Sequence, residues 1–215
     1  MKKAYVTVLY GNTIYFLGAI VLGFSLKRVK SSIDTIILVT NDVPPDQIKI
    51  LEYLYTKVIR IEYIHANEKL IKDYDKSRFK DVFTKLRCLE LDMYDKIILL
   101  DLDMLVLQNM DELFDLPTPS ACYRGKVGLT HGEIIPRKTA IKYGINAGLM
   151  ILKPDRKELD QILKDMQKPK LWKFKYPEQE YLSFHYAGKW RNVDIKYNYQ
   201  VGLEKRKENY YRDIK

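Results

Sequence analysis

Two carboxylates stand inside the most apolar stretch of the sequence. The segment IILLDLDMLVL, residues 97–107, is apolar except for Asp101 and Asp103. On a β-strand, residues i and i+2 face the same side, so we expect both carboxylates to project together at the end of a core strand. Paired carboxylates repel unless a cation lies beside them. Hard oxygen ligands suit Mg²⁺ or Mn²⁺, so this spacing predicts a divalent metal site formed by Asp101 and Asp103.

The Asp-x-Asp spacing by itself is a weak signal. A chain of 215 residues with 17 aspartates contains about one such triplet by chance, which is why matches are counted before they are interpreted. A second triplet, Asp73 and Asp75, lies in a polar stretch where solvated carboxylates need no explanation. Asp101 and Asp103 follow four apolar residues, where burial without a partner would be costly. The alternative for them is a pair of turn or cap aspartates at a strand end.

The elements that must position these residues follow from the apolar periodicity. Strands are predicted at 4–10, 35–40, 58–64, 97–107 and 148–153, separated by Gly, Pro and polar turns. Helices are predicted where Ile14, Leu17, Val21 and Ser25 recur up to Arg28, after Pro44 or Pro45, along the stripe 79–89, and at 156–166 and 177–186. This alternation indicates an α/β fold with a mainly parallel central sheet flanked by helices, in which ligands bind at the carboxyl ends of the strands.

Composition limits the class of protein. The length favours one domain, residues 1–215, and no window has the roughly 18 apolar residues that a membrane helix needs. The start of the chain does not resemble a signal peptide, and Cys88 and Cys122 have no metal-ligand spacing. A cytoplasmic location with reduced thiols is therefore expected.

A formal net charge of +9 leaves nucleic acid, a membrane surface or a small phosphate as partners, or simply a lysine-covered surface. The basic, aromatic run 203–215 has no zinc-finger spacing or RNP-type sequence beside it, so nucleic acid is not expected. Homodimer formation is left open. A basic binding module with a degenerate site remains the rival to an enzyme.

One enzyme class that uses such an aspartate strand is the haloacid-dehalogenase-like phosphatases. In that class the Asp-x-Asp strand opens the fold, and Gly-Thr usually follows the second aspartate. Here the strand is the fourth to be predicted, and Met104-Leu105 follows Asp103.

A second class fits much more of the chain, which resembles glycosyltransferase family 8, the glycogenin-like group. The resemblance is carried, in order, by VTVLYGNTIYFLGAIVLGFSL, FTKLRCLEL, DKIILLDLDMLVLQNMDELF, GINAGLMILKP and PEQEYLSFHY. It implies a GT-A (Rossmann-like) nucleotide-diphospho-sugar transferase fold. It also implies a metal-dependent retaining transferase that moves a hexose, glucose before others, from a UDP-sugar to a protein, glycan or polyol acceptor.

The resemblance also assigns residues. It implies catalytic roles for Asp103, Lys85, Glu178 and Gln179, and metal binding by Asp101 and Asp103. The donor would be contacted by Val8, Leu9, Tyr10, Asn12, Tyr15, Arg78, Lys85, Asp101, Leu102, Asp103, Asn146, Ala147, Gly148 and Gln179. From its helical position, Lys85 is expected to lay its stem on apolar surface and place its ammonium at a cleft rim. Most family members have Asp at the position of Glu178.

The third protein ligand of the family's metal is a His in a His-x-x-Gly-x-x-Lys-Pro-Trp-like segment. The segment HYAGKW, 185–190, resembles it, but in the family that segment follows a Tyr-Asn pair, and here Tyr197-Asn198 come later. We therefore expect His185 to have a packing role. The ligand segment is expected to be missing from this chain, which predicts weak metal binding.

Overall fold

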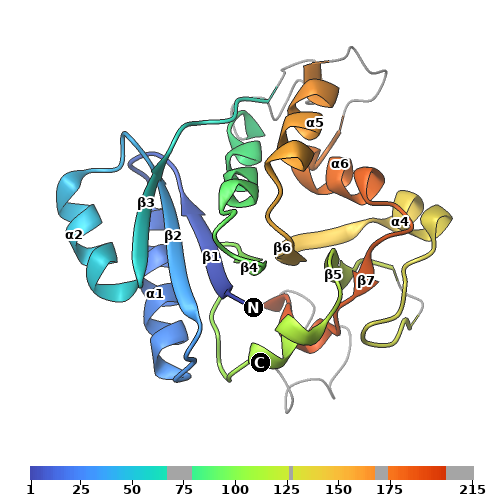
Figure 1. Cartoon of the computed structure of the whole chain (residues 1–215), viewed down its shortest axis with the longest axis horizontal. Coiled ribbons are helices and arrows are strands. Elements are labelled where there is room, and N and C mark those ends of the chain that lie inside the picture. The colour runs from blue at the N-terminus through green and yellow to red at the C-terminus, as the bar shows by residue number, and fades with distance from the viewer. Residues whose placement is uncertain (67–78, 126–127, 168–173, 202–215) are drawn as a thin grey trace.

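The computed structural model describes residues 1–66, 79–125, 128–167 and 174–201. Figure 1 shows a central sheet with helices packed against it. The strands are β1 (Lys3–Leu9), β2 (Asp34–Thr40), β3 (Lys57–Ile61), β4 (Lys96–Leu100), β5 (Ser120–Tyr123), β6 (Ile145–Leu152) and β7 (Arg191–Asn192). The α-helices are α1 (Tyr15–Arg28), α2 (Pro45–Leu54), α4 (Arg137–Tyr143), α5 (Arg156–Gln167) and α6 (Pro177–His185), and the 3₁₀ helices are η3 (Val82–Glu90), η4 (Asp111–Asp115) and η5 (Ile195–Tyr197).

The sheet has the strand order β3-β2-β1-β4-β6-β5-β7. Strands β3, β2, β1 and β4 are parallel, β6 runs antiparallel to β4 and β5, and β7 is parallel to β5. The prediction of a mainly parallel sheet is thus confirmed. Because β1, β2, β3 and β4 are parallel, their carboxyl ends meet at one edge, which is where such sheets bind ligands.

The sheet is buried on both faces, as mainly parallel sheets are. Along β1, Ala4 and Val6 belong to a core that includes side chains of η3, α5 and α6, whereas Tyr5 and Leu9 belong to a core that includes side chains of α1 and α2. This alternation is the two-residue period of a strand with apolar side chains on both sides. It explains why β1 is a nearly continuous apolar run.

The predicted strand 97–107 is wrong in its second half, because β4 ends at Leu100. The Asp101 N–H still donates to the Gly148 carbonyl at 2.9 Å, but the chain then leaves the sheet. It passes beside α1, where the Val106 N–H donates to Ser25 Oγ at 3.2 Å. Continuing the strand would carry charged side chains into a sheet buried on both faces, at a large desolvation cost.

Other boundaries also differ from the prediction. The stripe 79–89 forms a 3₁₀ helix over Val82–Glu90, and β6 begins at Ile145 rather than at residue 148. The apolar periodicity does not predict β5 or α4, because the stretch after Leu116 is rich in Pro and Gly, which are typical of loops. The polar stretch that contains Asp73 and Asp75 lies outside the described residues, as does the basic run 203–215.

Helix α1 forms as its periodicity predicts, but the periodic residues do not all face the core. Its buried residues are Ala19, Leu22, Gly23, Ser25 and Leu26. Ile14, Leu17 and Val21 are exposed. None of the helices in the described ranges is long and apolar enough to cross a bilayer.

Candidate active site

A cavity of about 470 Å³ opens at the carboxyl ends of β1 and β4. Its wall is formed by Val8 at the end of β1, by residues 101–103 just after β4, by Lys85 of η3, and by Glu178 and Gln179 in the first turn of α6. Segments far apart in the sequence therefore converge on one space. The parallel half of the sheet brings them together, because its strands end at a common edge.

Lys85 joins three of these segments. Its ammonium lies 2.6 Å from Asp101 Oδ1 and 3.0 Å from Glu178 Oε1, and it donates to the Ala147 carbonyl at 3.3 Å. Lys85 and Glu178 are 9% and 5% exposed. The ammonium was expected at the cleft rim, but it is buried in the wall of the cavity. A buried charge destabilises the fold unless an opposite charge lies beside it, so Lys85 and Glu178 each require the other.

Burial and charge act against each other in this cluster. Burial lowers the pKa of Lys85, but attraction to the Asp101 and Glu178 carboxylates outweighs burial, so the pKa lies well above its ordinary value. Burial raises the pKa of Glu178; Lys85 opposes that rise, and the charge of Asp101 adds to it. Lys85 therefore remains protonated at neutral pH. For Glu178, burial disfavours the ionised form of the carboxyl group.

The start of β6 forms the neighbouring part of the site. The Ala147 N–H donates to Gln179 Oε1 at 3.0 Å, so α6 and β6 hold each other in register at the cavity wall. Asn146 Oδ1 accepts from the Gly148 N–H at 2.8 Å and from Asn198 Nδ2 at 3.1 Å. The predicted strand starts at residue 148, but Asn146 and Ala147 already belong to β6.

The turn after β1 shapes another part of the cavity wall. Gly11 has a φ of +73°, a left-handed conformation that glycine adopts without steric cost. Its N–H donates to Thr40 Oγ1 at 3.0 Å, which ties the turn to the end of β2. Tyr10 and Tyr15 then line the cavity from either side of the turn.

Comparison with known proteins agrees with this architecture. The family model described as glycosyl transferase family 8 matches residues 6–215. The uncharacterized protein R707 of Acanthamoeba polyphaga mimivirus is 46% identical over 217 residues, covering 98% of this chain and 76% of that protein.

The chain belongs to glycosyltransferase family 8.

Other relatives are longer than the matched region. Galactinol synthase 1 of Solanum lycopersicum is 27% identical over 93% of this chain and 65% of its own length. Glycogenin-1 of Homo sapiens is 34% identical over 55% of this chain and 34% of its own length. The apo-form glycosyltransferase GlyE of Streptococcus pneumoniae TIGR4 superposes with a TM-score of 0.64 at 20% identity, covering 95% of this chain and 48% of GlyE. That likeness confirms the GT-A fold, and family membership argues against the dehalogenase-like phosphatase alternative.

Most of the predicted site residues of this family 8 chain line the cavity. They are Val8, Tyr10, Tyr15, Lys85, Asp101, Leu102, Asp103, Glu178 and Gln179. Asn146, Ala147 and Gly148 lie immediately behind the wall, since Ala147 contacts both Lys85 and Gln179.

Three predicted donor residues are placed differently. The Leu9 side chain is fully buried in the core that includes α1 side chains, and Leu9 is not among the residues that line the cavity. Asn12 is exposed, and its Oδ1 accepts from Gln47 Nε2 at 3.1 Å. Arg78 lies outside the described residues.

The structure adds cavity residues that motif matching missed. Thr13, Phe79, Val82 and Tyr176 also line the space. Val82 lies three residues before Lys85 on η3, and Tyr176 directly precedes α6. Their positions within a few residues of Lys85 and Glu178 could have predicted that they line the cavity, because neighbours three or four residues apart on a helix share a face.

The pair Asp101 and Asp103 fits a divalent cation only in part. Both residues line the cavity and offer hard oxygen donors. Within the described ranges, no group of three or more His, Cys, Asp or Glu residues could hold a metal ion. The donor set therefore suits a cation that completes its shell with ligand oxygens and water.

His185 is engaged elsewhere. Its Nε2 lies 2.5 Å from Glu158 Oε1, and its ring stacks on Tyr181 with centroids 5.6 Å apart. These contacts join α5 to α6, and His185 is not among the residues that line the cavity. The packing role expected for His185 agrees with this placement.

Proposed function

We propose that this chain transfers a hexose, glucose in preference to others, from a UDP-sugar to a hydroxyl group of a glycan, protein or polyol, with retention of anomeric configuration. The observation that carries the proposal is the cluster of Lys85, Asp101 and Glu178, in which Lys85 and Glu178 are buried, at a cavity formed by the carboxyl ends of β1 and β4. Membership of family 8 supports the reaction class.

The cluster supplies the charges that glycosyl transfer needs. Breaking the bond between sugar and diphosphate develops negative charge on the departing nucleotide, and a fixed cation in a largely buried site stabilises such charge far better than water does. The Lys85 ammonium is held by two carboxylates and a carbonyl, so it needs little reorganisation during the reaction.

The remaining wall residues would bind and orient the donor. Tyr10, Val8 and Tyr15 offer an apolar and aromatic surface for the uridine, while Glu178 and Gln179, which also line the cavity, would contact the sugar. The Ala147–Gln179 hydrogen bond fixes the orientation of the Gln179 amide. Mn²⁺ or Mg²⁺ held by Asp101 and Asp103 would act as a Lewis acid towards the diphosphate oxygens.

A donor panel tests the proposal directly. The protein is incubated with UDP-glucose, UDP-galactose and other UDP-sugars, with and without Mn²⁺, and released UDP is measured by chromatography. We expect metal-stimulated UDP release, fastest with UDP-glucose, and a melting temperature raised by UDP with Mn²⁺, because a ligand that binds the native state stabilises it. No UDP release and no shift with UDP, together with a shift by an oligonucleotide, would favour the basic binding module instead.

A further inference from the structure

An apolar surface follows the outer side of α1. It consists of Ile14, Tyr15, Leu17, Val21 and Phe24, together with Leu105 and Leu107, and is called the α1 stripe below. Leu105 and Leu107 flank Val106, whose N–H is bonded to Ser25 Oγ, so they lie beside the helix. Tyr15, at the N-terminal end of the stripe, also lines the cavity, whereas the other six residues are not among those that line it and have no role in the transfer reaction proposed above.

The stripe is larger than a monomer normally exposes. Its seven residues are between 43% and 79% exposed. At about 200 Å² for a fully exposed residue of this size, the total exposed area, with backbone atoms and the Tyr15 hydroxyl included, is about 800 Å². The largest apolar patch on a typical monomer is about 300–600 Å², and larger ones mark interaction sites. About 800 Å² per partner is the area of a specific, stable protein interface.

The spacing of the stripe suits another helix. Ile14, Leu17, Val21 and Phe24 alternate steps of three and four residues, the pattern with which helices pack along a seam. No charged residue occurs from Ile14 to Leu26. A two-fold axis makes such a patch face an identical patch, so the surface needs no partner other than itself.

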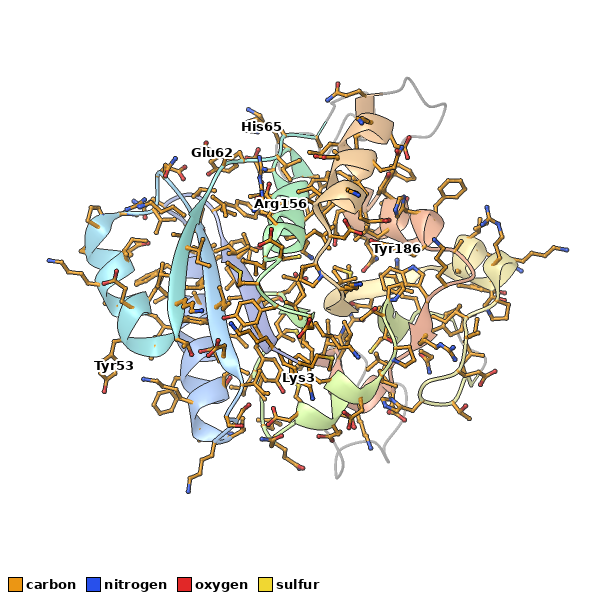
Figure 2. All side chains as sticks on the ribbon, in the orientation of Figure 1. Lys3, Tyr53, Glu62, His65, Arg156 and Tyr186 are labelled. Atoms are coloured by element: carbon orange, nitrogen blue, oxygen red, sulfur yellow. The ribbon has the colours of Figure 1, made fainter. Side chains whose placement is uncertain are left out.

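The charges around the stripe argue against an anionic membrane or nucleic acid as the occupant. Within α1, basic residues occur only at the C-terminal end, at Lys27 and Arg28. Lys27 is already engaged, since its ammonium donates to the Tyr53 carbonyl at 2.5 Å and lies 4.5 Å from the Tyr53 ring centroid. Tyr53 is labelled in Figure 2 and lies at the C-terminal end of α2. Towards the other end, the exposed carboxylate of Asp103 follows Leu102, whose carbonyl lies against Gly18 of α1.

We propose that the α1 stripe is the interface of a homodimer, in which α1 of one copy packs against α1 of a second copy of this chain. Apolar burial drives the association, whereas the net charge of +9 on each copy opposes it. Raising the salt concentration therefore strengthens the dimer, which is the opposite of the salt dependence of binding to an anionic surface.

Sedimentation equilibrium of the full chain tests this proposal. At 0.3 M NaCl and micromolar protein, we expect a mass of twice the 25.5 kDa chain. The double variant Leu17→Glu/Phe24→Glu is expected to be monomeric, with dissociation constants at least tenfold higher. Ile141→Glu is the matched control, because Ile141 is 49% exposed on α4, far from α1 in Figure 1. Circular dichroism and the UDP-induced thermal shift establish that each variant is folded.

A cross-link provides a second measurement. The native cysteines Cys88 and Cys122 are both buried, so an introduced thiol reacts alone. Under oxidation, Val21→Cys should form a disulfide-linked dimer and Ile141→Cys should not. A monomeric wild type at 100 µM, or a dimer that survives the double variant, would overturn the proposal. The proposal would also be overturned if the wild type were monomeric and bound vesicles containing an anionic lipid, and Leu17→Glu/Phe24→Glu lost that binding. That outcome would assign the stripe to a membrane.

Discussion

The carbonyl oxygen of Leu102 lies directly against the backbone of Gly18, so that a β-carbon at Gly18 would overlap it. Leu102 is the residue between Asp101 and Asp103. Glycine at position 18 thus lets α1 approach the segment that carries both carboxylates. A second glycine of the same helix, Gly23, has a different neighbour, because a β-carbon there would lie 2.8 Å from the Tyr55 ring.

This relationship predicts that Gly18→Ala weakens metal-dependent UDP binding. The added methyl group must push the Leu102 carbonyl away and move both carboxylates, and we expect affinity for UDP with Mn²⁺ to fall at least tenfold, about 1.4 kcal/mol. Alanine favours the helix by up to about 1 kcal/mol, so stability should suffer less than binding. Titration calorimetry measures the affinity.

Gly23→Ala is the control, expected to lower the melting temperature while keeping the affinity for UDP with Mn²⁺. Equal losses of affinity in both variants would contradict a positioning role for Gly18.

The metal pair gives a second prediction. Asp103→Asn should remove the Mn²⁺-dependent part of UDP binding and leave the fold intact, since Asp103 is exposed and lines the cavity. The readout is the thermal shift by UDP with and without Mn²⁺. Asp73→Asn, in the other Asp-x-Asp triplet, and Asp115→Asn, at an exposed site, should be silent. Equal effects at all three positions would show that the assignment to Asp101 and Asp103 is wrong.

Lys85 should be required for stability as well as for catalysis. Lys85→Met leaves two carboxylates without their cation, and removing one partner of a buried ion pair costs about 3–5 kcal/mol. Adding Glu178→Gln removes one orphaned charge, so the double variant should unfold at a higher denaturant concentration than Lys85→Met. Its transferase rate should stay low. Urea unfolding and UDP release separate the two effects, and a double variant no more stable than Lys85→Met would refute the charge argument.

The raised pKa of Glu178 predicts how stability depends on pH. A group whose pKa is higher in the folded state contributes its stability at low pH and loses it as the pH rises through the folded value. Ionised Glu178 therefore weakens the fold above its ordinary pKa of 4.5. The melting temperature of Glu178→Gln relative to wild type should increase from pH 4.5 to pH 8. A difference that stays constant or decreases over that range would mean that Lys85 outweighs burial at Glu178.

The placement of His185 makes the last prediction. His185→Ala should leave Mn²⁺-dependent UDP binding unchanged, because the imidazole is bonded to Glu158 and stacked on Tyr181. Losing these contacts should cost about 1 kcal/mol, or about 2–4 °C in melting temperature for a domain of this size. Calorimetric titration and a thermal scan measure the two quantities. A large loss of Mn²⁺ affinity in a folded variant would instead identify His185 as a metal ligand.

The sequence by itself determined the fold class and the family. The apolar runs of β1 and β2 and the helical periodicities are local patterns, and local patterns report secondary structure because side-chain direction repeats with the backbone. Five ordered motifs then pointed to family 8. The same patterns misplaced the end of β4, because an apolar run does not reveal where a chain leaves a sheet.

Tertiary structure alone decided how the site is connected and which side of α1 is exposed. Lys85 was expected to reach solvent, but it is buried between Asp101 and Glu178, residues 16 and 93 positions away along the chain. A salt bridge between residues so far apart in the sequence depends on the order of the strands and on where α6 packs. The spacing of residues along the chain predicts neither of these. Likewise, Leu17 and Leu22 are both apolar residues of one helix, and only packing against the sheet decides that Leu22 is buried while Leu17 remains at the surface.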